Sequence, residues 1–323
     1  MYRKISAIVI PTLIAVGIIV YMIYQVWDNL LQALRHIVPA WLAIAVIICL
    51  IAWILRGWRY QIILKSLAYR VSLAVSAACI FVSQTANLVI PARLGDFVRV
   101  FILNHEFTTT YSEGVSSIVV ERVFDVFTVA ILGAVALLFI LHVPSWVYSV
   151  VILPIIAAVI FFIFLFCLGK CTAENKYIRI VLTMLHEIRR ASLSVRSLIV
   201  LSASSIVIWL FDILVCVSVV FMLGQQVPFP VVVLAVVIGN LVKAVPLTPG
   251  GIGGYELALT AVFTVTGISW EMGFLIAVID HLIKNLVTLI GGVVSIYYFG
   301  DWVIPSIKTA FSLKIRGGDS SDP

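Results

Sequence analysis

Long apolar runs alternate with short polar connections along almost the whole chain. A run of about 20 apolar residues is long enough to cross a bilayer as a helix. By this measure we predict six spanning helices, at about residues 5–26, 41–64, 115–141, 147–168, 198–223 and 272–299. Two amphipathic stretches, 27–38 and 170–196, have the pattern of helices that lie on the membrane surface.

Two further apolar segments are interrupted by Pro and Gly. In the first, residues 73–90 are followed by a break at 91–95 and a short run at 97–103; in the second, 228–267 contains the break within 240–256. Pro removes a backbone donor and Gly weakens a helix. Because irregular backbone inside a bilayer must be buried by protein or line a wet cavity, we predict two re-entrant helical hairpins whose breaks mark a site.

The two breaks resemble each other. The triplet Asn87-Leu88-Val89 opens the first and Asn240-Leu241-Val242 opens the second, and each break runs on through Pro and Gly to a carboxylate, Asp96 or Glu256. A charged cluster follows each carboxylate roughly 25 residues later. Matching interruptions in two halves are typical of transporters whose substrate site lies at a repeat interface.

We therefore predict an all-α polytopic membrane protein, with about six spanning helices and two re-entrant hairpins in an inverted repeat. Residues 1–323 form a single transmembrane domain with half-repeats at about 41–142 and 198–299, and 300–323 form a disordered cytoplasmic tail. The repeat is inverted because one spanning helix, 147–168, joins the halves. The hairpins then enter from opposite faces.

Composition supports a membrane protein and leaves little soluble mass. The chain has 323 residues, of which 63% are hydrophobic and 11% charged, against about 25% charged in soluble domains. The net charge of +6 comes from basic residues in short flanks. These predict cytoplasmic N- and C-termini in the plasma membrane rather than a nucleic-acid partner. The five cysteines show neither disulfide nor zinc spacing, and we expect no metal or cofactor.

Charged residues in and after the breaks are the candidate site, because ionisable groups inside a membrane are costly and usually functional. The predicted substrate-binding set also includes three residues of the second break and reads Arg93, Asp96, Arg99, Glu121, Arg122, Asp125, Lys243, Pro249, Gly250, Gly251, Glu256, Asp280 and Lys284.

An alternative is that these charges only pair with one another. The pairs Asp96–Arg99, Arg122–Asp125 and Asp280–Lys284 have helical i,i+3 or i,i+4 spacing, and Asp212 could pair with Arg56 or Arg59. Arg93 and Lys243 have no such local carboxylate, which makes them the best candidates for substrate contact.

Helices that restart after a break expose free N–H groups that attract anions, and Arg offers a planar fork for phosphate. A lipid with a phosphate-bearing head group would suit such a place, with the carboxylates as proton acceptors or counter-charges. Catalytic motifs are not found: His186-Glu187 lacks the second His of a zincin, and there is no G-x-S-x-G or nucleotide-phosphate loop. We therefore expect no enzyme.

At the breaks the chain resembles the transmembrane domain of lysylphosphatidylglycerol synthases, the flippase-like integral membrane protein family. The motifs that carry this are Pro91 to Asp96 with Arg99, then Glu121-Arg122 with Asp125, then Pro246 and Pro249 to Gly253 with Glu256. The resemblance implies movement of a lipid across the bilayer, with an anionic or polyprenyl-phosphate lipid as partner.

Bacterial relatives fuse this domain to a soluble aminoacyl-transferring domain, whose activity we do not expect in a chain ending at Pro323. Two alternatives to a flippase remain: a membrane-embedded transferase acting on a lipid carrier, and a scaffold without transport activity for a separate lipid synthase. A homo-oligomer and a partner synthase are both left open.

Overall fold

A computed structural model describes residues 24, 38–90, 93–140, 143–169, 174–245, 248–300 and 302–303. Within these ranges every regular element is a helix. The elements are α2 (Pro39–Ser66), α3 (Leu73–Val89), α4 (Asp96–Phe107), α5 (Tyr111–Leu137), α6 (Ser145–Cys167), α7 (Lys176–Ser192), α8 (Val195–Met222), α9 (Phe229–Ala244), the 3-10 turn η2 (Pro249–Gly251), α10 (Gly254–Val265) and α11 (Trp270–Phe299).

The predicted span at 5–26 and the predicted surface helix at 27–38 lie outside the described residues, apart from Tyr24 and Val38. The same holds for most of the predicted tail at 300–323, and for Pro91, Ala92 and Pro246 in the breaks.

Four of the helices are long and apolar enough to cross a membrane: α2, α6, α8 and α11. Each coincides within a few residues with a predicted span. The predicted span at 115–141 is also a helix, α5, which has 27 residues. Its sequence is less apolar because Glu121, Arg122 and Asp125 lie on it.

Side-chain caps explain where several of these helices begin. At the start of α5, Thr110 and Glu113 form a reciprocal capping box, which satisfies two backbone donors that a helix N-terminus leaves free. Ser72, Ser194 and Ser269 accept hydrogen bonds from the first turns of α3, α8 and α11.

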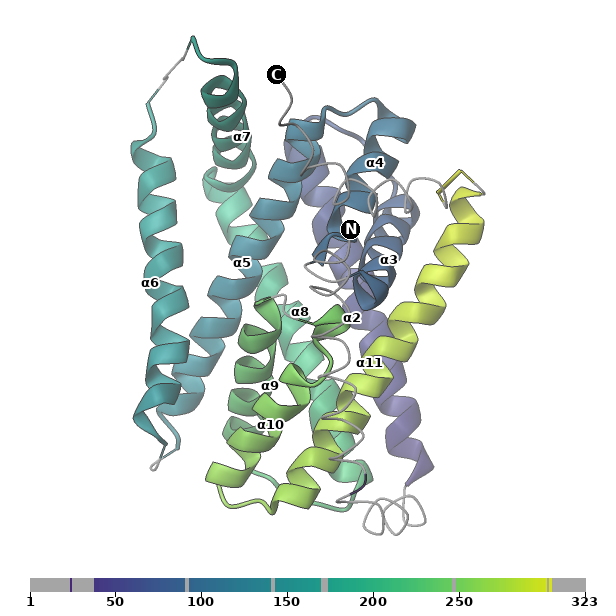
Figure 1. Ribbon diagram of the computed structural model, residues 1–323, viewed down its shortest axis with the longest axis vertical. Helices are drawn as coiled ribbons and strands as arrows, with labels where there is room; N and C mark the ends of the chain where they lie inside the picture. Colours follow the sequence, from purple (N-terminus) through teal and green to yellow (C-terminus); the bar gives the residue numbers. More distant parts are fainter. Residues whose placement is uncertain are drawn as a thin grey trace, which may run out of the picture.

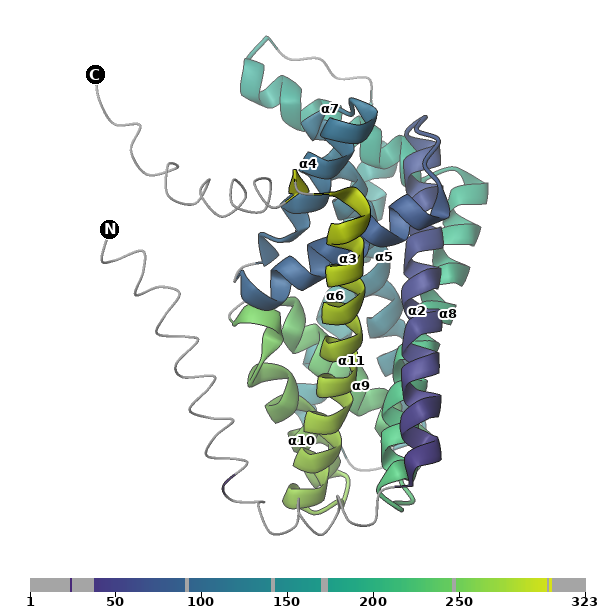
Figure 2. The ribbon, with the colours of Figure 1, turned by 90° about the vertical axis from the view of Figure 1, so that its right-hand side faces the viewer.

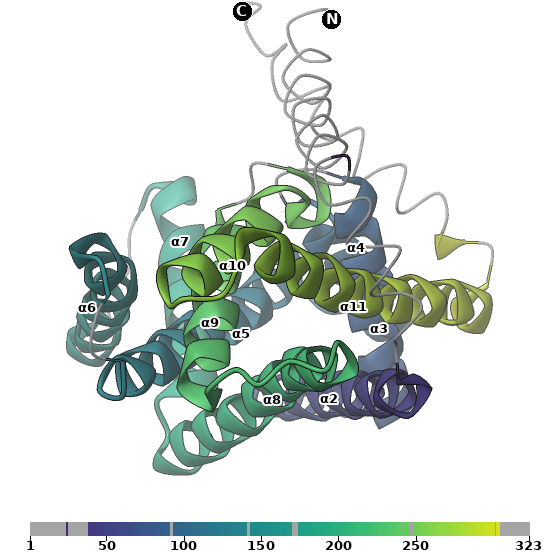
Figure 3. The same cartoon turned by 90° about the horizontal axis from the view of Figure 1, so that it is seen from below.

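The short helices lie in opposite halves of the molecule. Figure 1 shows α3 and α4 in the upper half and α9 and α10 in the lower half, whereas α2, α5, α8 and α11 extend along the long axis. Helices α2 and α8 pack side by side (Figure 2). Seen from below, α6 lies at the edge of the bundle (Figure 3), and many of its apolar side chains, Leu153 and Phe166 among them, are exposed.

The apolar core follows the same division. One cluster of buried side chains contains most of α9 and α10, and a second contains α3 and α4 with the first half of α5. Helix α9 is buried from Val231 to Gly239, which accounts for its sequence, since a helix that is hydrophobic on every side is buried on every side. Between the two clusters lie the two breaks.

One end of the molecule is basic. The amphipathic helix α7, predicted as a surface helix within 170–196, lies at the upper end in Figure 1. Its Glu187 accepts hydrogen bonds from Ser112 and Ser116 of α5. Tyr69, in the loop after α2, donates to Glu113 of α5; burial and this hydrogen bond raise the pKa of Tyr69 to about 12. We call this end, with α7, Lys65 and Arg70, the basic end.

Candidate substrate site

The second break owes its shape to glycine. Gly250, Gly251 and Gly253 have φ of 62°, 77° and 84°, in the left-handed region that side chains with a Cβ disfavour. A Cβ on Gly251 would lie 2.5 Å from Cγ of Lys243, and one on Gly250 would lie 3.1 Å from Cδ2 of Leu88. The second break therefore packs closely against α9. It also contacts α3, which belongs to the other pair of short helices, α3 and α4.

The first break packs closely against α3 in a similar way. A Cβ on Gly95 would lie 2.5 Å from the backbone nitrogen of Asn87, so only glycine lets the chain return this closely. Arg93 has a φ of 53° and donates a hydrogen bond to the backbone carbonyl of Lys243 at 3.1 Å. The two breaks, from opposite halves of the molecule, thus meet.

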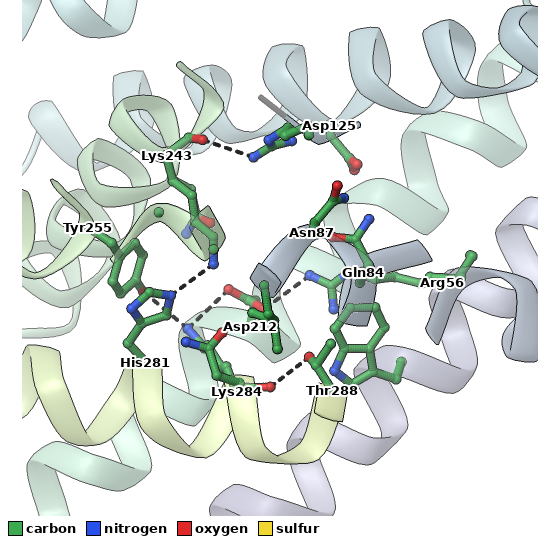
Figure 4. Close-up of a pocket in the computed structure, with 18 of the residues that line it drawn as sticks. Arg56, Gln84, Asn87, Asp125, Asp212, Lys243, Tyr255, His281, Lys284 and Thr288 are labelled. Atoms are coloured by element: carbon green, nitrogen blue, oxygen red, sulfur yellow. Dashed lines mark hydrogen bonds and ion pairs between the residues drawn. The ribbon is translucent and has the colours of Figure 1, made fainter. Parts of the chain in front are cut away.

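A cavity of about 130 Å³ lies where they meet (Figure 4). A water molecule needs only about 10–15 Å³, so this space is large enough to hold water. Its walls carry residues of α2, α3, α5, α8, α9, α10, α11 and both breaks: Trp53, Arg56, Ile80, Gln84, Asn87, Leu88, Arg93, Glu121, Arg122, Asp125, Trp209, Asp212, Asn240, Lys243, Thr248, Gly250, Gly251, Tyr255, His281, Lys284, Asn285 and Thr288.

On the α5 side of the cavity the charges are paired across helices. Arg59 of α2, which is buried, donates to both carboxylate oxygens of Asp125 at 2.6 and 3.0 Å. Arg122 donates to Asp96 at 2.8 Å. Arg99 of α4, also buried, pairs with Glu121 at 2.7 Å.

On the α11 side a second network joins four helices, α2, α8, α10 and α11. Lys284 lies 2.9 Å from Asp280 and 3.1 Å from Asp212 of α8. Arg56 of α2 pairs with the same Asp212 at 3.1 Å, and the Tyr255 hydroxyl donates to Asp280 at 2.7 Å. Removing one partner of a buried pair leaves an uncompensated charge, so these contacts fix the helices around the cavity.

Arg93 and Lys243 differ from the other cations of the cavity wall. No carboxylate among the described residues lies within 4.0 Å of either side chain. The Lys243 ammonium instead lies 3.0 Å from Nε2 of His281. His281 contacts Glu256 through Nδ1 at 2.6 Å, and Glu256 accepts the backbone N–H of Gly253 at 2.7 Å.

The remaining wall is aromatic and amidic. The Arg56 guanidinium lies 4.9 Å from the ring centroid of Trp53 and 5.6 Å from that of Trp209, as in cation–π contacts. Asn87 and Asn240, the first residues of the two repeated triplets, both line the cavity. The sequence echo thus corresponds to two chain segments that converge in space.

The predicted substrate-binding residues divide into two groups. Some line the cavity, namely Arg93, Glu121, Arg122, Asp125, Lys243, Gly250, Gly251 and Lys284. Others do not line it, namely Asp96, Arg99, Pro249, Glu256 and Asp280. Four residues of this second group contact the side chain of a wall residue: Asp96 contacts Arg122, Arg99 contacts Glu121, Glu256 contacts His281 and Asp280 contacts Lys284.

The predicted local pairs need correction. Asp280–Lys284 is confirmed at 2.9 Å, and so is the pairing of Asp212 with Arg56. The pairs Asp96–Arg99 and Arg122–Asp125 are wrong, because Asp96 pairs with Arg122. Asp96 meets Arg122 because α4 packs against α5, and Asp125 pairs with Arg59 because α2 also packs against α5.

Sequence reasoning missed His281 as a wall residue. A single histidine on an apolar helix carries no motif. Its signal is its place in the echo: Asp280-His281 with Lys284 on α11 repeats the spacing of Glu121-Arg122 with Asp125 on α5. It also missed Trp53, Gln84, Tyr255, Asn285 and Thr288, which line the cavity. Among the described residues, no cluster of three or more His, Cys, Asp or Glu side chains is arranged to hold a metal ion.

Comparison with known proteins places the chain among related membrane proteins. Over 99% of its length it is 27% identical to Glycosyltransferase AglD of Haloferax volcanii, of which it spans 58%. A UPF0104 membrane protein of Pyrococcus horikoshii is 24% identical over 87% of this chain and 95% of its own length. One from Methanocaldococcus jannaschii is 26% identical over 65% of this chain and 92% of its own.

No solved structure matches the chain. The model of the lysylphosphatidylglycerol synthase TM region matches residues 8–292, which include both breaks and every charged residue of the cavity wall. The chain belongs to this family of membrane proteins.

Proposed function

We propose that this protein moves a phosphate-bearing lipid, a phospholipid or a polyprenyl-linked lipid, across the membrane by way of the cavity between its two breaks. One observation carries the proposal: Arg93 from the first break and Lys243 from the second line the same cavity, and no carboxylate in the described chain lies within 4.0 Å of either charge. Both side chains are half-buried, and shielding a charge from water without a nearby counter-ion is costly. An anionic head group would supply the missing counter-charge.

We further propose that the two short helix pairs are re-entrant hairpins of an inverted repeat. Three features support this. The pairs lie in opposite halves of the molecule (Figure 1). The carboxylate at the start of each second helix pairs with a basic residue of the next long helix, Asp96 with Arg122 and Glu256 with His281. These partners are 26 and 25 residues apart.

A broken helix in each half, facing one wet cavity, suits alternating access. The head group would sit between the hairpins, and the movement of one half against the other would expose the cavity first to one side and then to the other. The polar wall suits a lipid head group, because amide side chains such as Gln84 and Asn285 can form hydrogen bonds with hydroxyl or phosphate oxygens. The basic end would face the cytoplasm, in keeping with the positive-inside rule.

The test is transbilayer movement of labelled lipid in proteoliposomes. Vesicles would contain a labelled phosphatidylglycerol, a labelled polyprenyl phosphate or a labelled zwitterionic lipid, and the wild type would be compared with Arg93→Ala and Lys243→Gln. Lys65→Gln is the matched control, since it removes an exposed cation at the basic end. We expect both cavity variants to slow the movement of anionic lipid and the control to leave it unchanged. Equal rates in all four proteins would contradict the proposal.

A second candidate function is sugar transfer to or from a lipid carrier, and the observation in its favour is the name of the Haloferax volcanii relative. Because this chain spans 58% of that relative, the transferase activity of the whole relative is only a hypothesis here. With a sugar donor added to the vesicles, mass spectrometry of the lipids after transport would separate the two functions. A transporter leaves the lipid chemically unchanged, whereas a transferase changes its mass by one sugar unit.

A further inference from the structure

The cavity contains a hydrogen bond between two nitrogens, each of which can carry a positive charge. Nζ of Lys243 on α9 lies 3.0 Å from Nε2 of His281 on α11. A protonated amine has no lone pair to accept with, and neither has a protonated imidazole nitrogen. One partner in this contact must therefore offer a lone pair, so that Lys243 and His281 together hold at most one positive charge.

The contact between Glu256 and the other ring nitrogen of His281 bears on where the imidazole proton lies. One oxygen of Glu256 accepts the backbone N–H of Gly253, and the other lies 2.6 Å from Nδ1 of His281. We assign Glu256 as the ionised carboxylate, so that Nδ1 of His281 donates to it and Nε2 offers its lone pair to the Lys243 ammonium. Glu256 is thereby placed to stabilise a second positive charge, on the imidazole.

We propose that an anion bound beside Lys243 and a proton bound at His281 enter the cavity together. An anionic group that approaches Lys243 draws the ammonium toward itself and away from Nε2. The freed lone pair then takes a proton from water, and the imidazolium that forms lies between Glu256 and the new anion. When the anion leaves, the ammonium returns to Nε2 and the proton goes back to water. The inference rests on the anion-binding part of the proposed function and adds the coupled ion.

The other charged and titratable groups near this pair are already committed. Asp280 pairs with Lys284, Asp212 pairs with both Lys284 and Arg56, and the Tyr255 hydroxyl donates to Asp280. Arg93 donates to the Lys243 carbonyl and is a guanidinium, which stays protonated. The surroundings of the pair, taken element by element, are Arg93 of the first break, Asp212 of α8, Tyr255 and Glu256 of α10, and Asp280 and Lys284 of α11. Among these groups, Nε2 of His281 is therefore the atom whose lone pair becomes free when an anion draws the Lys243 ammonium away.

Proton uptake can be measured without any transport. The protein, in an uncharged detergent and weak buffer with a pH-indicator dye, would be titrated with inorganic sulfate. Sulfate keeps its charge across the neutral range, so any proton taken up belongs to the protein. We expect uptake of up to about one proton for each sulfate bound, and an affinity that rises as the pH falls by up to about tenfold per pH unit.

His281→Gln is the informative variant, because a glutamine amide can still donate to Glu256 and accept from Lys243 but cannot take up a proton. It should bind sulfate without proton uptake and with an affinity independent of pH. His105→Gln is the matched control, since His105 is exposed on α4 and this change should leave uptake at the wild-type level. Sulfate binding by the wild type without proton uptake would overturn the proposal whether or not the variant folds. Absence of sulfate binding, or uptake that persists in folded His281→Gln, would also overturn it.

The lipid-movement assay and the sulfate-binding assay test the proposed function and this inference separately. Proton-linked sulfate binding without lipid movement in vesicles would remove the transport function and leave the coupling. Lipid movement together with sulfate binding that takes up no proton would remove the coupling and leave the transport function.

Discussion

Nη2 of Arg93 donates a hydrogen bond to the backbone carbonyl oxygen of Lys243 across 3.1 Å, although the two residues are 150 positions apart in the chain. This contact joins the breaks of the two short helix pairs directly. It also places the guanidinium and the Lys243 ammonium on one cavity wall. A single side chain thus bridges the two halves at the point where a substrate anion would bind.

Arg93→Ala should weaken sulfate binding by about tenfold to a hundredfold, because a charge-assisted hydrogen bond contributes about 1.5–3 kcal/mol. Arg93→Lys should bind sulfate with an affinity between those of the wild type and Arg93→Ala, since lysine keeps the charge but lacks the planar fork. Calorimetric titration in detergent would measure both affinities. Arg70→Ala, at the basic end, removes an exposed arginine and should bind sulfate like the wild type. Wild-type affinity in Arg93→Ala would rule out a direct role for this residue.

The glycines of the second break offer a test of its backbone. Gly250→Ala and Gly251→Ala should each destabilise the protein by at least about 1–2 kcal/mol, because their φ values are positive. Gly251→Ala should be the worse of the two, since its Cβ would lie 2.5 Å from the Lys243 side chain. Unfolding in a graded denaturing detergent would measure the change.

Gly254→Ala is the control for the glycine series. Gly254 begins α10 without a positive φ, and a Cβ there would meet only Val242, at 3.6 Å. Alanine favours a helix over glycine by about 1 kcal/mol, so this variant should be as stable as the wild type or more stable. A loss equal to that of Gly251→Ala would show that the close approach to Lys243 is not the cause.

The helices and the breaks were predictable because apolar runs and Pro–Gly interruptions are local signals. The charge partners were not. Asp96 has Arg99 one turn away in its own helix, yet its salt bridge goes to Arg122 of α5. Arg59 reaches Asp125 across 66 positions. Such pairs depend on which helix faces pack together, and a single sequence does not contain that information.

The candidate site was predictable in part for the same reason. Arg93 and Lys243 were singled out because they lacked a local carboxylate, and the structure leaves both without one in the described chain. His281 was missed because its role comes from Glu256 on one side and Lys243 on the other. Both partners lie on other helices, so no spacing within α11 reveals them.

Asp96 should be important for the stability of the first break. Its carboxylate accepts hydrogen bonds from Ser83, Gln84 and Asn87 of α3 as well as from Arg122. Asp96→Asn removes the charge opposite the half-buried guanidinium of Arg122 and should destabilise the protein by about 2–3 kcal/mol. Glu106→Gln, which breaks an exposed contact with His105 on the same helix, should change stability little. Similar losses in both variants would contradict this account of α4.

The buried Arg59–Asp125 pair joins α2 to α5 behind the cavity, and a double-mutant cycle would show how it acts. Arg59→Met leaves Asp125 without its bidentate partner, and Asp125→Leu leaves a buried guanidinium facing an apolar group. Each change should cost about 3–5 kcal/mol.

The double variant should lose clearly less than the sum of the two single losses, because it buries neither charge unpaired. Since Arg59 does not line the cavity, Arg59→Met should still bind sulfate in its folded fraction. Strict additivity would show that the two side chains act independently. Loss of binding in folded Arg59→Met would show that the pair also sets the shape of the anion site.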